Sequence, residues 1–333
     1  MMKRSTTMDV AKGIAMLMVI LGHIGVGIVG NYFYTFHLPL FFVVTGYFWK
    51  EEAFGTFLKK KALGILVPYV FFALLLAGFE TLTVWHSFEK FLTLLHNFLV
   101  QRRFTTLWYL AALFWGCVFY ELLRRICRNR FYIQGILCVI LSMAGIVYLQ
   151  VWKSPLPWNI ETGCICLSFM WTGQYLKKRD FINRLDEQAW KKKLLCVIVP
   201  SFGGIILSLL NYYLSGETLN MWDGTYGNGP LTIMAAILGS IGIFALASLW
   251  GKSKMLAYTG ANSITFLALQ NNIGLYLALT LWGKLGVQEM TTPIKVLQKL
   301  LFFIFIYLLC AGIHQIIIWL HLGILLGKRK KKK

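Results

Sequence analysis

Apolar stretches recur along the whole chain, separated by short polar or basic segments. Many are about 20 residues long, which matches a hydrocarbon core roughly 30 Å thick. The pattern predicts an all-α, polytopic integral membrane bundle of about ten transmembrane helices. The expected spans are residues 8–29, 31–49, 62–84, 105–123, 131–150, 158–176, 194–214, 231–250, 256–282 and 297–322.

Composition agrees with this pattern. Hydrophobic residues make up 58% of the 333 residues and charged residues 14%, whereas about a quarter of a soluble protein is charged. Met1–Thr7 is too short and too basic for a cleaved signal peptide, so the first span is expected to be retained. We predict one membrane domain over residues 1–327 and a basic cytoplasmic tail over 328–333.

The distribution of positive charge predicts the orientation. With the N-terminus inside, 26 of the 33 Lys and Arg residues fall in segments assigned to the cytoplasm. The chain is therefore expected to be a multi-pass protein with both termini inside. The net charge of +20 is explained by this bias and by attraction to anionic membrane lipids, and a nucleic-acid partner is not expected.

Seven cysteines are scattered along the chain, most of them inside apolar spans. No CxxC pair and no Cys/His spacing of a metal site is present. Neither a disulfide framework nor a metal site is predicted.

The first span carries ionisable residues, which are costly in a membrane and usually functional. Lys12 and His23 are eleven residues apart, close to three helical turns, so they share one face with about 16 Å between them along the axis. Asp9 lies three residues before Lys12 and is placed to pair with it.

The second span returns through Phe36-His37-Leu38-Pro39. If the hairpin turns near Gly30, His23 and His37 are equally far from the tip and lie at similar depth. Pro39 opens the helix, which is tolerated where a cavity is lined. A packing role explains a single buried histidine, but two at one depth with Lys12 in line favour function. Histidine suits proton transfer because its pKa of about 6.5 is near working pH.

Lys59, Lys60 and Lys61 precede the third span. Topogenic charge explains most of this cluster. However, cations at a helix N-terminus oppose the helix dipole, and a bound anion would resolve that conflict.

Other polar groups are less specific. Trp108 and Tyr109 open the fourth span as an ordinary interfacial pair, and of Gln270, Asn271 and Asn272 at least one must face the bundle interior. Snorkelling near helix ends is expected for three acidic residues: Glu80, Glu121 and Glu161. Loop 215–230 contains acidic, aromatic and glycine residues that suit hydroxyl-rich ligands such as sugars, although a simple turn-rich loop also explains it: Glu217, Trp222, Asp223 and Tyr226.

Five motifs in this order resemble the acyltransferase-3 family of membrane O-acyltransferases, which modify bacterial surface glycans, and within it the fucose 4-O-acetylase-like subgroup. The motifs are Asp9-Val10-Ala11-Lys12-Gly13 with His23, Phe36-His37-Leu38-Pro39-Leu40-Phe41-Phe42 through Gly46-Tyr47, Lys61 through Pro68-Tyr69, Leu107-Trp108-Tyr109-Leu110, and Gly260-Ala261-Asn262-Ser263-Ile264. The first two together are specific, and the others are individually weak.

The resemblance implies that an acetyl group passes from cytoplasmic acetyl-CoA to a hydroxyl of an extracytoplasmic or lipid-linked glycan at the bacterial cytoplasmic membrane. No permanently bound cofactor is implied. His23 would be the general base or a transient acetyl carrier, and His37 its support. Further roles would fall to Lys12, Lys60 and Lys61 at the donor, and to Asp9, Trp108, Tyr109, Gln270 and Asn271 as substrate-binding or supporting residues, with Gln270 or Asn271 at the oxyanion.

Two positions depart from the family pattern. The family's Arg-x-x-Arg is Lys61 and Gly64 here, which leaves open how donor phosphates are held unless Lys59 or Lys60 substitutes. The histidine often found in the ninth span is Gln270.

Two other classes of function remain open. A transporter or flippase of glycan intermediates would use the same buried polar groups, although no internal repeat typical of transporters is found. A non-catalytic membrane sensor on the same fold is the other alternative. The acceptor glycan, the length of the acyl group and a homo-oligomeric state are not specified by the sequence.

Overall fold

The computed structural model describes residues 6–25, 27–284 and 292–327, and in this part of the chain it contains helices and one isolated bridge between Asn220 and Thr225. Seven helices or continuous helical runs of the described residues are long and apolar enough to cross a membrane. They are α1 (Thr6–Ile24), the run from α3 to η2 (Phe54–Trp85), α7 (Phe131–Trp152), α10 (Trp190–Ser215), α11 (Gly229–Trp250), the run from α13 to α14 (Ser263–Gly283) and α15 (Thr292–Trp319). The protein is an all-helical membrane protein.

Three further long helices carry more polar groups and coincide with the remaining expected spans: α2 (Ile28–Tyr47), α6 (Trp108–Ile126) and α8 (Ile160–Lys178). They pack together, with α8 in contact with α2, α6 and α7. Many of their side chains are buried, so polar groups on them find protein partners. The number of membrane crossings and the orientation stay predictions.

Several predicted boundaries are wrong. The helix expected to begin at residue 62 begins at Phe54 and runs through α3 (Phe54–Lys61), η1 (Ala62–Leu66), α4 (Val67–Glu80) and η2 (Thr81–Trp85). Two of the segments between the expected spans contain the short helices α5 (Phe88–Val100) and α9 (Phe181–Asp186). The expected ninth span is divided at Asn262 into α12 (Lys254–Ala261) and a run of α13 (Ser263–Leu269), η4 (Gln270–Leu275) and α14 (Tyr276–Gly283). The predicted tail at 328–333 lies outside the described residues.

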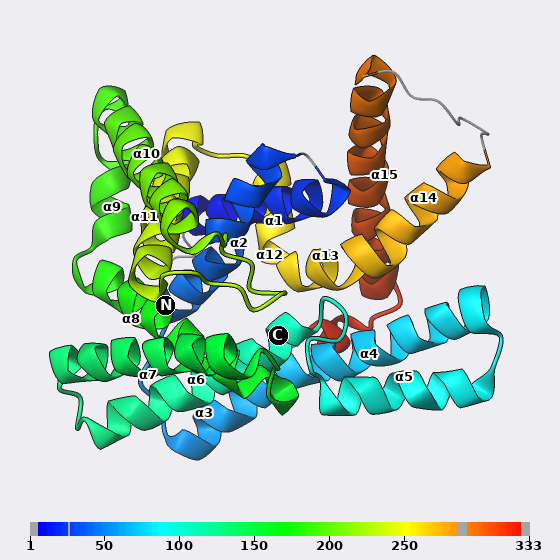
Figure 1. The fold of residues 1–333 in the computed structure, drawn as a ribbon, viewed down its shortest axis with the longest axis horizontal. Coiled ribbons are helices and arrows are strands. Elements are labelled where there is room, and N and C mark those ends of the chain that lie inside the picture. Colours follow the sequence, from blue (N-terminus) through cyan, green and yellow to red (C-terminus); the bar gives the residue numbers. More distant parts are fainter. Residues whose placement is uncertain (1–5, 26, 285–291, 328–333) are drawn as a thin grey trace.

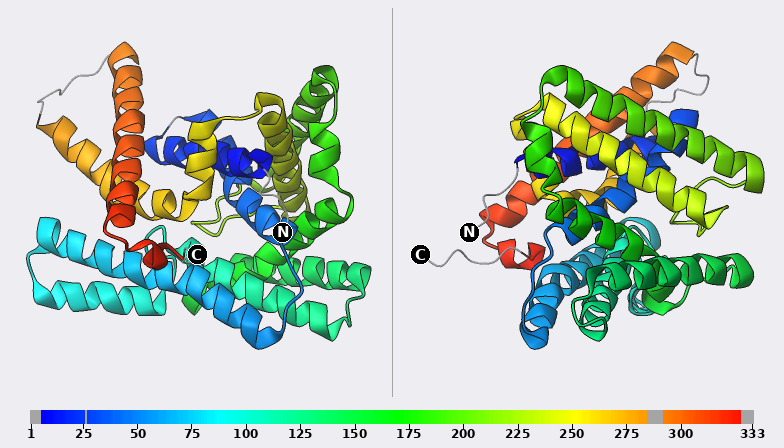
Figure 2. Two further views of the ribbon diagram at one scale, coloured as in Figure 1. Left: turned by 180° about the vertical axis from the view of Figure 1, so that it is seen from behind. Right: turned by 90° about the vertical axis from the view of Figure 1, so that its left-hand side faces the viewer.

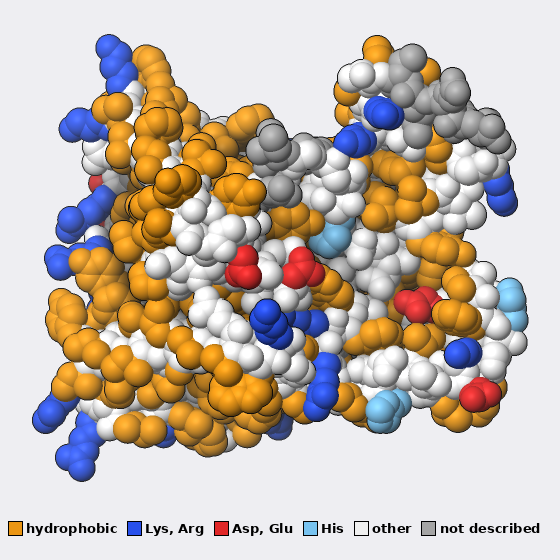
Figure 3. All heavy atoms as spheres, in the orientation of Figure 1, with side chains coloured by type: hydrophobic (Ala, Val, Ile, Leu, Met, Phe, Trp, Pro, Cys, Tyr) orange, Lys and Arg blue, Asp and Glu red, His pale blue; other side chains and the backbone are white. Residues whose placement is uncertain are grey.

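The helices form two layers. The continuous run α3–α4, together with α5, α6 and α7, lies below, and α1, α2 and α10–α15 lie above, as both Figure 1 and the rotated views of Figure 2 show. Contacts of α2 with α8 join the layers, and α1 packs between α2 and α12 in the upper one. Apolar side chains cover most of the face in Figure 3, as expected of a surface that meets lipid.

Glycines allow α2 and α8 to cross closely. A Cβ atom on Gly46 would lie 1.8 Å from the carbonyl oxygen of Met170, and one on Gly173 would lie 1.9 Å from that of Val43. Small residues at such crossings let helix backbones approach, which drives helix association in membranes. This crossing holds the two layers together.

Gly46→Ala is expected to destabilise the protein by about 1–3 kcal/mol because α2 and α8 must separate to accept the methyl group. The midpoint of thermal unfolding in detergent measures the loss. Gly78→Ala on α4 is the matched control, since a Cβ there meets no atom within 4 Å. Equal midpoints for the two variants would contradict the close crossing.

Candidate active site

Three cavities follow one another through the centre of the molecule. The lysine cavity has a volume of about 350 Å³ and is lined by Lys50, Lys60 and Lys61 among others. The central cavity, of about 310 Å³, is lined by Lys12, Lys61 and Ser263 among others. The histidine cavity, of about 230 Å³, is lined by both His23 and His37, with residues of α6, η4 and the loop between α10 and α11.

Neighbouring cavities share lining residues. The lysine and central cavities share Thr45, Phe48, Lys61 and Leu113. The central and histidine cavities share three residues, Leu38, Tyr109 and Leu267, which we call the waist. The three spaces therefore form one series that runs from a cluster of cations, past the largely apolar waist, to a pair of imidazoles.

Both histidines are held in the same way. The Nδ1–H of His23 donates to the carbonyl oxygen of Val19 at 2.8 Å, and the Nδ1–H of His37 donates to that of Phe33. Each partner lies four residues earlier on the same helix. Because Nδ1 carries the proton, Nε2 is the unprotonated atom of each ring. Neither Nε2 has a hydrogen-bond partner among the described residues, so both are available as proton acceptors.

Aromatic and amide groups surround the imidazoles. The Tyr34 ring lies between them, with its centroid 6.4 Å from that of His23 and 5.2 Å from that of His37. Gln270 is fully buried, and its Nε2 lies 3.3 Å from Nδ1 of His23. Both of these nitrogens carry protons, so the Gln270 amide packs against the His23 ring without a hydrogen bond to Nδ1.

The loop between α10 and α11 covers the histidine cavity. Asn220 and Trp222 of this loop line it, and the Trp222 ring meets the Trp108 ring edge to face at 6.4 Å. Two indole rings on one cavity provide apolar faces against which a sugar ring can stack. In Figure 3 acidic side chains and a histidine lie near the centre of the face, with basic side chains just below them.

A buried ion pair anchors that loop. Arg103 donates to Glu161 at 3.2 Å and to the backbone carbonyl of Trp222 at 3.2 Å, and both side chains of the pair are at most 7% exposed. Gly224 passes so close that a Cβ there would lie 2.2 Å from Arg103 Nη1. The expectation that Glu161 snorkels at a helix end is therefore wrong, because its carboxylate is turned inward to Arg103.

Glu121 is a second buried acid for which snorkelling is the wrong explanation. It is fully buried and accepts hydrogen bonds from Arg124 at 2.7 and 2.9 Å and from Arg125 at 2.8 Å. This cluster joins the end of α6 to the segment before α3, where Arg125 also donates to the Glu52 carbonyl. It supports the lysine cavity from one side.

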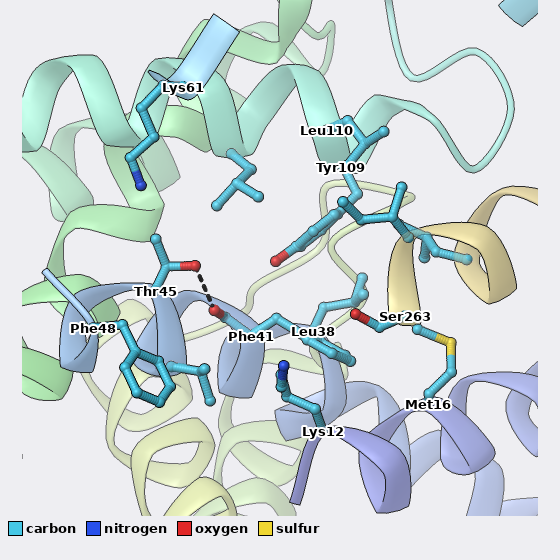
Figure 4. Close-up of a pocket in the computed structure, with 14 residues that line it drawn as sticks. Lys12, Met16, Leu38, Phe41, Thr45, Phe48, Lys61, Tyr109, Leu110 and Ser263 are labelled. Atoms are coloured by element: carbon cyan, nitrogen blue, oxygen red, sulfur yellow. Dashed lines mark hydrogen bonds between the residues drawn. The ribbon is translucent and has the colours of Figure 1, made fainter. Parts of the chain in front are cut away.

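The lysines enter the cavities from opposite sides. Figure 4 shows the Lys12 amine pointing into the central cavity from α1 and the Lys61 amine pointing into it from the other side. Lys12 pairs with Asp9 at 2.8 Å, and Lys61 lies over the Trp49 and Phe57 rings at 5.1 and 5.7 Å. Lys60 pairs with Glu52 beside the lysine cavity.

The structure changes the explanation of the lysine cluster. Lys59, Lys60 and Lys61 lie inside a continuous helix that begins at Phe54, so no free N–H groups of a helix N-terminus face them. The prediction of an anion bound at such an N-terminus is therefore wrong. Lys59 is exposed and lines none of the three cavities, whereas Lys60 and Gly64 both line the lysine cavity. The positive charge of the lysine cavity therefore comes from lysine side chains and not from the N–H groups of a helix N-terminus.

The family model for an acyltransferase domain matches residues 6–324, nearly the whole chain. The chain belongs to this acyltransferase-3 family. Nothing among curated proteins and nothing among solved structures matches it. The cavity series is accordingly that of a membrane acyltransferase. The fucose 4-O-acetylase-like subgroup stays a prediction.

The predicted site residues of the acyltransferase fall into two groups. His23, His37, Trp108, Tyr109 and Asn271 line the histidine cavity, with Gln270 behind His23. The predicted donor-side residues Lys12, Lys60 and Lys61 line the other two cavities. Asp9 lines neither of these cavities and pairs with Lys12. The structure thus places the predicted groups along one path. Their chemical roles stay predictions.

Sequence reasoning missed four residues of this site. Tyr34 lies three residues before His37, and helical spacing alone would have placed it on the same face. Asn220 and the pair of Arg103 with Glu161 carry no local signal, because they come together only when three distant segments fold.

Within the described residues no group of three or more His, Cys, Asp or Glu side chains lies together as a metal site would. All seven cysteines are free thiols. The polar groups that line the cavities include imidazole, ammonium, amide and phenol groups, which suit proton transfer and anion binding.

Proposed function

We propose that the protein is an O-acetyltransferase that moves an acetyl group from cytoplasmic acetyl-CoA to a hydroxyl of an extracytoplasmic or lipid-linked glycan. The observation that carries this proposal is the series of three cavities, with cations at one end and imidazoles and indoles at the other. The positive-inside distribution of Lys and Arg supports placing the lysine cavity at the cytoplasmic face of a bacterial membrane.

The donor would lie along the lysine and central cavities. Coenzyme A carries its phosphate charges at one end of a long uncharged arm, and Lys50, Lys60 and Lys61 offer cations where the series begins. The arm would pass Phe48 and Leu113, which line both cavities, and bring the thioester near Lys12. Lys61 lines both cavities, so it would hold the phosphate nearest to the arm.

The acceptor would occupy the histidine cavity, with its sugar ring against Trp108 and Trp222 and its hydroxyls bonded to Asn220 and Asn271. His23 would take the proton of the attacking hydroxyl on Nε2. The acceptor oxygen then bonds to the acetyl carbon, the carbon–sulfur bond breaks, and His23 returns the proton to the coenzyme A thiolate. The Val19 carbonyl would keep the ring in place through Nδ1–H, with the Gln270 amide packed beside it.

Transfer of label from [acetyl-14C]acetyl-CoA tests the function directly. Inverted membrane vesicles present the lysine cavity to added donor, and label should appear in glycan material inside the vesicle. Label that requires the protein supports the proposal. Loss of a glycan intermediate from one side without any acetyl label would instead show transport, and binding without either reaction would show a sensor.

Lys61→Ala is expected to raise the KM for acetyl-CoA about 10-fold while kcat changes little, because a charge-assisted bond to phosphate contributes about 1.5–3 kcal/mol. Steady-state transfer assays at varied donor concentration measure both constants. Lys59→Ala is the matched control, since Lys59 is the exposed neighbour that lines no cavity. An unchanged KM in Lys61→Ala would remove Lys61 from the donor site.

A further inference from the structure

The waist contains one polar group, and that group is unpaired. Leu38 and Leu267 contribute only apolar atoms, whereas Tyr109 contributes a phenol. Tyr109 is 5% exposed, and its hydroxyl has no hydrogen-bond partner among the residues that the structure describes. A buried hydroxyl without a partner is unfavourable by about 1–3 kcal/mol. Such a group is expected where a ligand supplies the missing bond.

The hydroxyl points into the cavity series. In Figure 4 the Tyr109 ring extends from α6 and its oxygen is directed into the central cavity, between Lys12 and Lys61. Neighbouring rings fix this direction, with Phe42 at 4.8 Å and Phe41 at 6.3 Å between ring centroids. The phenol is therefore a fixed donor at the place where the central and histidine cavities meet.

From this position we infer that the Tyr109 hydroxyl donates the hydrogen bond that stabilises the oxyanion of the acyl-transfer step. The inference rests on the proposed function. The thioester carbonyl reaches the waist from the central cavity and the attacking hydroxyl reaches it from the histidine cavity. When the acceptor oxygen bonds to the carbonyl carbon, the electron pair of the C=O bond moves to its oxygen, which accepts from Tyr109. When that pair returns, the coenzyme A thiolate leaves and the phenol keeps its proton throughout.

This assignment replaces the role expected for the amides of the ninth span. The Nε2 of Gln270 is directed to Nδ1 of His23, and Gln270 lines none of the three cavities. Asn271 lines only the histidine cavity, on the acceptor side. Tyr109 alone of these residues lines both cavities in which the reacting groups would lie.

Tyr109→Phe removes only the hydroxyl and keeps the ring packing. We expect kcat for acetyl transfer to fall about 100-fold or more, as for a single oxyanion donor in other enzymes, with each KM changed less than 3-fold. Tyr120→Phe is the matched control on the same helix: it is fully buried, lines none of the three cavities and donates to Gln174. That variant should keep its full kcat per folded molecule.

A binding experiment separates the hydroxyl's role from a general loss of structure. S-ethyl-CoA lacks the carbonyl oxygen and should bind equally to wild type and Tyr109→Phe. The trifluoromethyl ketone analogue of acetyl-CoA forms a tetrahedral adduct, and it should bind at least 10-fold more weakly to the variant. Equal binding of the ketone, or an unchanged kcat beside an active wild type, would overturn the inference and leave the acetyltransferase standing. A wild type that transfers no acetyl group from acetyl-CoA would overturn both.

Discussion

His23→Ala is expected to lower kcat for acetyl transfer by about 10²- to 10⁴-fold, the range for removing a general acid–base group. The physical reason is the state of the ring: Nδ1–H donates to the Val19 carbonyl, so Nε2 is the atom that would receive the acceptor proton in the proposed reaction. The KM for acetyl-CoA should change little, because the donor cations lie in the other two cavities. Transfer of labelled acetyl by purified protein in lipid nanodiscs measures both constants.

His314→Ala is the matched control. His314 is also a buried histidine on a membrane helix, and its Nδ1 bonds to Thr265 at 2.9 Å, but it lies outside the three cavities. Its removal should leave kcat unchanged in the folded protein. If His23→Ala keeps full activity and His37→Ala loses it, the base is His37, which presents Nε2 in the same way.

Arg103→Ala is expected to be the most destabilising single change, at about 3–5 kcal/mol, because it leaves the buried Glu161 without its cation. Thermal unfolding in detergent should show a large fall in the midpoint. Arg102→Ala is a close control, because Arg102 is the neighbour of Arg103 in sequence and its side chain is exposed. Arg103→Ala also removes the hydrogen bond to the Trp222 carbonyl. At a temperature where this variant stays folded, its KM for the acceptor should therefore rise as well.

Glu161→Gln separates the ion pair from the shape of the site. Arg103 donates to Oε1 of Glu161 and the Leu156 N–H donates to Oε2 at 3.1 Å, so glutamine removes the charge and keeps one of these two acceptor oxygens. Its loss of stability should be smaller than that of Arg103→Ala. Equal stabilities of Arg103→Ala and Arg102→Ala would show that the ion pair of Arg103 with Glu161 does not stabilise the fold.

The sequence predicted the helices well because the membrane imposes a simple length rule. The long apolar runs behave as expected in α1, α7, α10, α11 and α15. The rule places the start of the third helix too late, because Lys59, Lys60 and Lys61 are polar and yet belong to the helix that begins at Phe54. It also misses α5, whose apolar face is too short to resemble a span.

Part of the site was predictable because helical geometry is as regular as the length of a membrane span. Helical spacing relates residues within one helix, so it placed Lys12 in line with His23 and Asp9 beside Lys12. It says nothing about partners on other helices. The pairing of Arg103 with Glu161, the position of Tyr109 at the waist and the Asn220–Trp222 cover depend on packing between distant segments.

The left-handed backbone of the segment before α6 illustrates this limit. Gln101, Arg103 and Thr105 all have positive φ angles, of 43°, 55° and 53°, which non-glycine residues rarely adopt. The Gln101 side chain holds the segment by accepting from the Phe104 N–H at 2.7 Å and by donating to the Tyr69 hydroxyl at 2.8 Å. No residue type in this segment signals such a turn, so sequence alone could not have placed Arg103.

The waist also has an electrical consequence for the proposed reaction. Moving one elementary charge across a membrane potential of 100 mV changes its free energy by about 2.3 kcal/mol. The apolar section at Leu38 and Leu267 separates the cations of the lysine and central cavities from the histidine cavity. In the proposed reaction the phosphates of coenzyme A would stay on the cation side, and only the acetyl group, which is uncharged, would pass to the acceptor. A cell could then modify its outer surface at the same rate whether its membrane is energised or depolarised.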